Sequence, residues 1–161
     1  LLYQSRTEDA FDALYKATWS NEQQEMSFYY LACIEAGRGN YEEAMQMVDK
    51  GLVKNSHNVK ARGLRAYLFR KMGKTEQAAR EIEENLAVEP FDYVSRLERS
   101  YVDGRQQASL LKEFNTLARN FHENYLMTAR AYAEFGASEE DVAVLSQGAE
   151  AWPLLFTSKD T

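Results

Sequence analysis

Two pairs of arginine residues recur along the sequence with the spacing of one helical face. Arg62 and Arg65 are three residues apart, and Arg96 and Arg99 repeat the pair 34 positions later. A guanidinium group can bind a carboxylate through two parallel hydrogen bonds, so these four arginines could bind an acidic partner. The alternative is structural, because arginine stems also pack between helices and pair with carboxylates of the same chain. The expected internal partners are Glu35, Glu76 and Glu98.

The residue types that usually carry catalysis or bind metal ions are few. His57 and His122 are far apart, and neither has a second potential ligand at a metal-binding spacing. Cys33 is the single cysteine, so it forms no internal disulfide, and the sequence shows no base positioned to activate it. Glycine-rich phosphate-binding loops are absent as well. We therefore predict a non-catalytic protein with no metal site and no cofactor.

Composition and charge narrow the class of protein further. The 161 residues are 45% hydrophobic and 27% charged, which is typical of a globular chain. The formal net charge of -6 argues against a nucleic-acid partner, since binding to phosphates needs a basic face. No apolar run approaches the roughly 18 residues that span a bilayer, so we expect no membrane partner. Only two prolines and eight glycines interrupt the chain, which favours helices over strands.

A repeat of 34 residues organises the apolar and small residues. Within one period, an apolar stripe at helical spacing follows a glycine, which predicts a helix, a tight turn and a second helix. Gly39 and Gly73 occupy the turn positions, and Asn40 with Glu43 fits a helix cap and its first turn. The stripe consists of Tyr41, Ala44, Met45, Val48 and Leu52. The columns in register include Ala10, Ala44 and Ala78; Leu14, Val48 and Ile82; and Ala32, Ala66 and Ser100.

This pattern resembles the tetratricopeptide-repeat (TPR) family. The family places a small residue in the first helix, then a glycine, then an alanine, and a proline after the second helix. Ala66, Gly73, Ala78 and Pro90 match all four positions. The resemblance implies an all-α fold, a right-handed superhelix of antiparallel helix hairpins. Its units would cover residues 1–24 in part, 25–58, 59–92, 93–121 with a degenerate turn at 103–105, and 122–156.

Three shorter runs resemble a narrower bacterial family, in which such repeats follow a large β-rich domain of unknown function that is similar to carbohydrate-active folds. The runs are Ala13–Trp19, Val59–Ala66 and Glu89–Tyr93. This resemblance implies that the chain is the C-terminal region of a longer protein. An alternative function follows from it, namely an accessory or oligomerisation region of a larger carbohydrate-active protein.

The TPR resemblance also implies a binding surface, because the first helices of such repeats line a concave face on which extended peptides lie. Tyrosines interspersed with cations are typical of interface hot spots. The candidate partner-binding residues are Tyr29, Tyr30, Lys60, Arg62, Arg65, Tyr67, Arg70, Arg96, Arg99, Tyr101 and Arg130. We expect the partner to be a protein or peptide, which would be acidic if the arginines bind it. The alternatives are another domain of the parent chain and a second copy of this chain. The lysine and asparagine set with which the family clamps a peptide carboxylate is missing.

The C-terminal run Ala151–Phe156 is too apolar for a free tail. We expect it to fold back over the last hairpin, or otherwise to dock on a second copy or another domain.

Overall fold

The computed structural model describes residues 2–17, 24–118 and 123–151. These residues form nine α-helices and no strand, which confirms the predicted all-α class. The helices are α1 (Leu2–Ala17), α2 (Gln24–Gly37), α3 (Tyr41–Lys54), α4 (Val59–Lys71), α5 (Thr75–Val88), α6 (Tyr93–Val102), α7 (Gln107–Ala118), α8 (Glu123–Glu134) and α9 (Ser138–Ala151). The apolar run at the C-terminus, which was expected to fold back, lies outside the described residues beyond Ala151.

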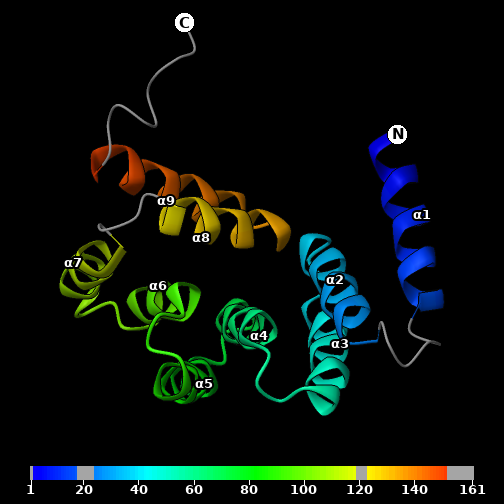
Figure 1. Cartoon of the computed structure of the whole chain (residues 1–161), viewed down its shortest axis with the longest axis horizontal. Coiled ribbons are helices and arrows are strands. Elements are labelled where there is room, and N and C mark those ends of the chain that lie inside the picture. The colour runs from blue at the N-terminus through cyan, green and yellow to red at the C-terminus, as the bar shows by residue number, and fades with distance from the viewer. Residues whose placement is uncertain (1, 18–23, 119–122, 152–161) are drawn as a thin grey trace, which may run out of the picture.

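Consecutive helices pack as four hairpins: α2 with α3, α4 with α5, α6 with α7, and α8 with α9. Helix α1 packs on α2, where the Arg38 guanidinium lies 3.0 Å from a Glu8 carboxylate oxygen and 5.2 Å from the centre of the Phe11 ring. The first three hairpins stack in a row, with second helices α3, α5 and α7 on the outside (Figure 1). We call the opposite side, which is lined by first helices α2, α4 and α6, the concave side.

Three first helices end in the same left-handed glycine turn. Gly39, Gly73 and Gly136 have φ angles of 81°, 74° and 71°, a conformation that glycine adopts without a Cβ penalty. After Gly39, the Asn40 amide donates to the Glu35 carbonyl oxygen at 2.9 Å, which is the long bond of a Schellman motif. The equivalent bonds after Gly73 and Gly136 have the same length. The predicted turns at Gly39 and Gly73 are therefore confirmed.

Two helices begin at residues that are one repeat period apart. Asn58 caps α4 by accepting from the Ala61 amide at 3.1 Å, and Asp92 caps α6 by accepting from the Ser95 amide at 3.2 Å. Asn40 occupies the N-cap position of α3 and Glu43 lies in its first turn, as predicted. The Asn40 side chain does not cap α3, however; its amide donates to a Glu35 carboxylate oxygen at 2.9 Å, because this asparagine follows the glycine turn and faces the end of α2.

The repeat columns of small residues form the helix contacts of the core. Ala32 and Ala66 in first helices, and Ala44 and Ala78 in second helices, are fully buried. A methyl group at these positions lets the two backbones of a hairpin approach closely. Larger buried side chains from the neighbouring columns fill the space between successive hairpins, among them Leu31, Val48, Leu64, Leu68 and Ile82.

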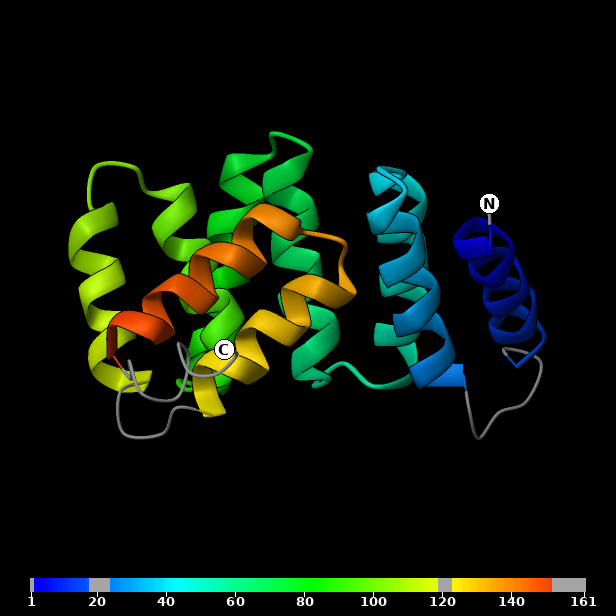
Figure 2. The same cartoon turned by 90° about the horizontal axis from the view of Figure 1, so that it is seen from above.

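The fourth hairpin, α8–α9, lies across the concave side instead of extending the row (Figures 1 and 2). Helix α8 packs against α2 and α6, and its terminal turn reaches α2. There, Gly136 faces Gly37 so closely that a Cβ added to Gly136 would lie 2.6 Å from the Gly37 Cα atom. Two residues without side chains therefore permit this contact, which brings the C-terminal hairpin back to the second helix of the chain.

Candidate functional site

The two predicted arginine pairs make the same contacts one repeat period apart. The Nε atom of Arg62 donates to the Ser56 carbonyl oxygen at 2.5 Å, and the Nε atom of Arg96 donates to the Pro90 carbonyl oxygen at 2.6 Å. Ser56 and Pro90 are themselves 34 positions apart. Arg62 and Arg96 therefore each bind the loop that precedes their own helix.

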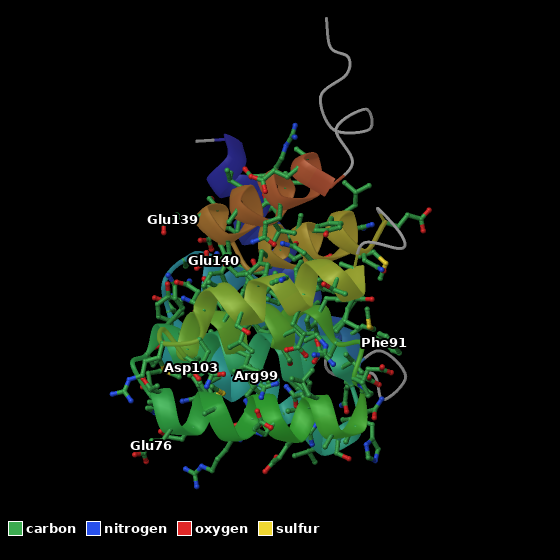
Figure 3. The ribbon with its side chains drawn as sticks, turned by 90° about the vertical axis from the view of Figure 1, so that its left-hand side faces the viewer. Glu76, Phe91, Arg99, Asp103, Glu139 and Glu140 are labelled. Carbon is green, nitrogen blue, oxygen red and sulfur yellow. The ribbon has the colours of Figure 1, made fainter. Side chains whose placement is uncertain are left out.

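The second arginine of each pair reaches back to the second helix of the preceding hairpin. Arg65 Nε lies 3.6 Å from Asp49 Oδ1 on α3, and Arg99 Nε lies 3.4 Å from Glu83 Oε1 on α5 (Arg99 is labelled in Figure 3). Asp49 and Glu83 are again one period apart. The 34-residue register thus fixes the ionic contacts between hairpins as well as the apolar ones.

The internal carboxylates that bind these arginines differ from the expected ones. Arg62 Nη1 lies 3.5 Å from Glu81 Oε1 on α5, and Arg96 Nη1 lies 2.7 Å from Glu113 Oε1 on α7. The predicted partners were wrong because the arginines point toward the second helices, whereas Glu35 and Glu98 are on first helices. Glu35 binds Arg38, Glu98 binds Arg70, and Glu76 is exposed on α5 (Figure 3).

Two of the four predicted tyrosines are covered by the α8–α9 hairpin. Tyr29 and Tyr67 are each 2% exposed. The Tyr29 hydroxyl donates to Glu134 Oε2 on α8 at 2.9 Å, and the Tyr67 ring lies 5.3 Å from that of Phe135. Tyr30 and Tyr101 are half-buried, whereas Arg130 lies on the outer surface of α8 with its side chain 83% exposed. The hairpin therefore occupies much of the surface on which a partner was expected.

Arg70 joins the hairpin to the stack through a buried cluster of charges. Its Nε atom donates to Glu98 Oε2 at 2.5 Å, and its Nη2 atom donates to Glu98 Oε1 and to Glu140 Oε1, both at 3.0 Å. The guanidinium also lies 4.7 Å from the centre of the Tyr101 ring. The Tyr132 hydroxyl of α8 donates to Glu98 Oε1 as well. The cluster therefore joins four helices, namely α4, α6, α8 and α9.

Burial dominates the electrostatics of this cluster. Glu98 is completely buried, and loss of solvent raises the pKa of its carboxyl group, although the hydrogen bonds from Arg70 and Tyr132 oppose that shift. Sequence reasoning named Glu98 as a partner of the paired arginines, not of Arg70, and it missed Tyr132 and Glu140. The available signal was the repeat column Tyr30, Leu64, Glu98 and Tyr132, in which a single carboxylate replaces an aromatic or aliphatic residue.

An apolar cleft on the concave side remains open beside the hairpin. It has a volume of about 150 Å³ and lies between the first turns of α4 and α6 and the facing side of α8. Its lining repeats the 34-residue register, since Val59, Tyr93 and Met127 form one column and Lys60, Val94 and Thr128 form the next. Tyr29, Gly63, Phe91, Asp92, Ala131 and Phe135 complete the lining.

Gly63 lines the cleft where α4 comes closest to Val94 of α6. The repeat places Tyr29 one period before Gly63 and Leu97 one period after it, so two large side chains flank a position that has none. A Cβ atom on Gly63 would lie 3.2 Å from Cγ1 of Val94, which shows that even a methyl group would be tight. The absence of a side chain at Gly63 therefore permits the close approach of Val94, and the cleft lies beside this contact.

The rim of the cleft combines exposed apolar side chains with one cation. Phe91 is 61% exposed and Met127 is 66% exposed. Lys60 is exposed with its ammonium 5.9 Å from the centre of the Tyr29 ring, and it forms no ion pair among the described residues. Asp92 lines the wall, but its carboxylate accepts from the amide and the hydroxyl of Ser95. Sequence reasoning named Tyr29 and Lys60 here and missed Gly63, Phe91 and Met127.

A second, more polar cavity of about 660 Å³ lies between α1, α2 and the α8–α9 turn, and Cys33 is part of its lining. Cys33 is 5% exposed, and burial raises the pKa of its thiol to about 12. Because the thiol is protonated at neutral pH, it is a poor nucleophile. His57 is exposed in the loop before α4, and His122 lies outside the described residues.

Metal ligands and membrane-spanning helices are not found in the part of the chain that the structure describes. No three histidine, cysteine or acidic side chains there are grouped in a way that would hold a metal ion. None of the helices in these ranges has both the length and the apolar character needed to cross a bilayer.

Comparison with known proteins supports the fold. No protein-family model matches the sequence, and no curated protein matches it. The structure is similar to a crystal structure of MamA protein, with a TM-score of 0.62, 13% identity, and coverage of 99% of this chain and 91% of that one. A second MamA crystal structure has a TM-score of 0.60, 15% identity and 92% coverage of both chains.

A thermophilic TPR protein of Thermus thermophilus is also similar, with a TM-score of 0.63 and 19% identity over 96% of this chain and 87% of that chain. At these identities the likeness concerns the fold. The fold expected from the 34-residue register is thereby confirmed.

Proposed function

We propose that this chain, which has the tetratricopeptide-repeat fold, is a non-catalytic protein-interaction module that binds a segment of a partner protein in the open cleft of its concave side. The observation that carries the proposal is the rim of the cleft, where Phe91 and Met127 are both more than half exposed around an apolar cavity. Apolar side chains gathered around a cavity on a protein surface are characteristic of binding sites.

The position of the α8–α9 hairpin reduces the number of predicted partner-binding residues that are open to a partner. Tyr67 and Arg70 are engaged by the hairpin, and the paired arginines are engaged by second helices. Lys60 and the edge of Tyr29 are the predicted residues that line the cleft. We therefore assign partner binding to the cleft, in place of a ladder of arginines. The alternative role, as an accessory region of a larger carbohydrate-active protein, stays a prediction.

Site-specific photo-crosslinking tests the proposal. A benzophenone amino acid replaces Phe91 at the rim, and in a control it replaces Val53, which is 84% exposed on α3. We expect the chain that carries the crosslinker at position 91 to give a discrete crosslinked species with its partner protein. The substitution Met127→Glu in the same chain should abolish this species. The control substitution Val142→Glu, at a position 61% exposed on α9, should leave it intact.

Two results would contradict the proposal. One is an equal set of crosslinked species from position 53, which would indicate non-specific contact. The other is a species from position 91 that survives Met127→Glu, since a partner seated in the cleft must contact both side chains.

A further inference from the structure

We infer that the cleft recognises a partner segment by one large apolar side chain, which enters the apolar cavity beside Gly63, and by an adjacent carboxylate, which pairs with Lys60. This inference rests on the proposed function and adds the chemistry of the partner to it. The occupant is a protein segment with an aromatic or branched aliphatic residue next to an aspartate or glutamate.

The shape and chemistry of the cavity specify the apolar anchor. A cavity of about 150 Å³ with an apolar lining is large enough for a benzene ring. The polar groups in its wall are already satisfied, since Asp92 binds Ser95 and the Thr128 hydroxyl donates to the Asn124 carbonyl oxygen at 2.6 Å. A polar side chain would therefore lose its water without gaining a partner, whereas an apolar one fills the space.

Lys60 supplies the charge selectivity. It is the one basic residue among those that line the cleft, while the one acidic residue there, Asp92, is buried and bonded to the amide and the hydroxyl of Ser95. The formal net charge of the whole chain is -6, so long-range attraction does not favour an acidic partner. Recognition of a carboxylate must therefore be local, at the rim where Lys60 meets the cavity.

A peptide library tests both parts of the inference. A library of random linear peptides displayed on phage is selected on the whole chain, and the enriched peptides are synthesised and their affinities measured by fluorescence anisotropy. We expect them to share a large apolar residue beside an aspartate or glutamate. Gly63→Leu, which restores the side chain of the next repeat, should weaken binding at least about tenfold.

Charge is tested by Lys60→Gln, with Lys50→Gln on the exposed face of α3 as the matched control. We expect a roughly two- to fivefold loss for Lys60→Gln, because the ion pair is exposed, and no change for the control. Circular dichroism verifies that the variants fold. If Gly63→Leu does not fold, Met127→Glu takes its place, since this exposed side chain contributes little to the core.

The outcomes separate the inference from the proposed function. Enriched peptides without an acidic residue, bound equally by Lys60→Gln but lost with Gly63→Leu, would overturn the carboxylate and leave the cleft as the binding site. Enriched peptides that bind Gly63→Leu and Met127→Glu as well as the unaltered chain would overturn both. A selection that enriches no peptide would overturn the inference, while crosslinking at position 91 would still decide the proposed function.

Discussion

The Tyr132 hydroxyl donates a hydrogen bond of 3.0 Å to Glu98 Oε1, and the two residues are one repeat period of 34 positions apart. In a regular stack, equivalent positions of neighbouring units lie side by side. Here the α8–α9 hairpin crosses the concave side, yet the equivalent residues still meet. The contact places a hydroxyl against a carboxylate that is completely buried and that also binds Arg70.

Replacement of Arg70 by methionine should be the most damaging single change in this cluster. It keeps the length of the stem but leaves Glu98 and Glu140 buried without their cation, and removal of one partner of a buried ion pair typically costs about 3–5 kcal/mol. Urea unfolding followed by circular dichroism measures the loss. Arg80→Met, at an exposed position on α5, is the control and should change stability by less than about 0.5 kcal/mol. Equal losses in the two variants would show that the cluster is not a structural link.

The three left-handed glycines should differ in their tolerance of alanine. Gly39→Ala and Gly73→Ala each place a side chain on a residue with positive φ, which should lower the free energy of unfolding by roughly 1–2 kcal/mol. No steric clash adds to this cost, because no atom lies within 4 Å of the added Cβ. Gly136→Ala should cost roughly 1–3 kcal/mol more, because its Cβ would meet the backbone of Gly37. The same urea unfolding measures all three. A cost for Gly136→Ala equal to the other two would show that the hairpin does not rest on α2 as described.

Arg62 and Arg96 should contribute to stability in similar steps. Arg62→Ala and Arg96→Ala each remove one bond to a loop carbonyl and one ion pair, so each should lower the free energy of unfolding by about 1–1.5 kcal/mol. The loss for Arg62→Ala should be the larger one, because Arg62 also donates to Asn85 Oδ1 at 3.3 Å. The two residues share no partner, so the losses should add within about 0.5 kcal/mol, with helical content retained. Arg130→Ala, on the solvent side of α8, serves as the control. A double variant with unaltered stability would argue that these arginines are free to bind a partner.

The Cys33 thiol should resist modification until the pH is strongly alkaline. Its pKa is raised from 9.0 to about 12 by burial, so at pH 8 the folded chain holds about a thousandfold less thiolate than the unfolded chain. Reaction with a disulfide reagent should accelerate about tenfold for each pH unit between 8 and 10. In urea, the rate should instead level off near pH 9. Rapid stoichiometric reaction of the folded chain at pH 8 would contradict the burial of this thiol.

The same shift has a consequence for stability that depends on pH. The pKa of Cys33 is higher in the folded state than in the unfolded state. The contribution of this thiol to the free energy of unfolding is therefore fully present below pH 9. It is lost as the pH rises toward about 12, since the unfolded chain gives up its proton first. Burial also raises the pKa of the Tyr101 hydroxyl to about 12, which acts in the same direction. The free energy of unfolding should therefore fall with rising pH above 9.

The sequence predicted the parts of the fold that depend on local register. Gly73 and Ala78 mark a turn and a helix contact because each acts within one hairpin, and the structure confirms both. The position of α8–α9 depends on contacts such as Tyr29 with Glu134, which are 105 positions apart, and no periodic pattern encodes such a distance. The cleft was missed for a related reason, since α8, which supplies Met127 and Thr128 to its lining, is placed by such long-range contacts.

The return of α8–α9 to α2 also determines the order in which the molecule can be completed. The first hairpins join residues that are close along the chain, and such local contacts form quickly and while the polypeptide is still being synthesised. The bond between Tyr29 and Glu134, in contrast, has to wait until both helices have left the ribosome. The surface of the α2–α3 hairpin therefore stays uncovered until α8 has been synthesised, and the contact between α8 and α2 forms after the contacts within the first hairpins.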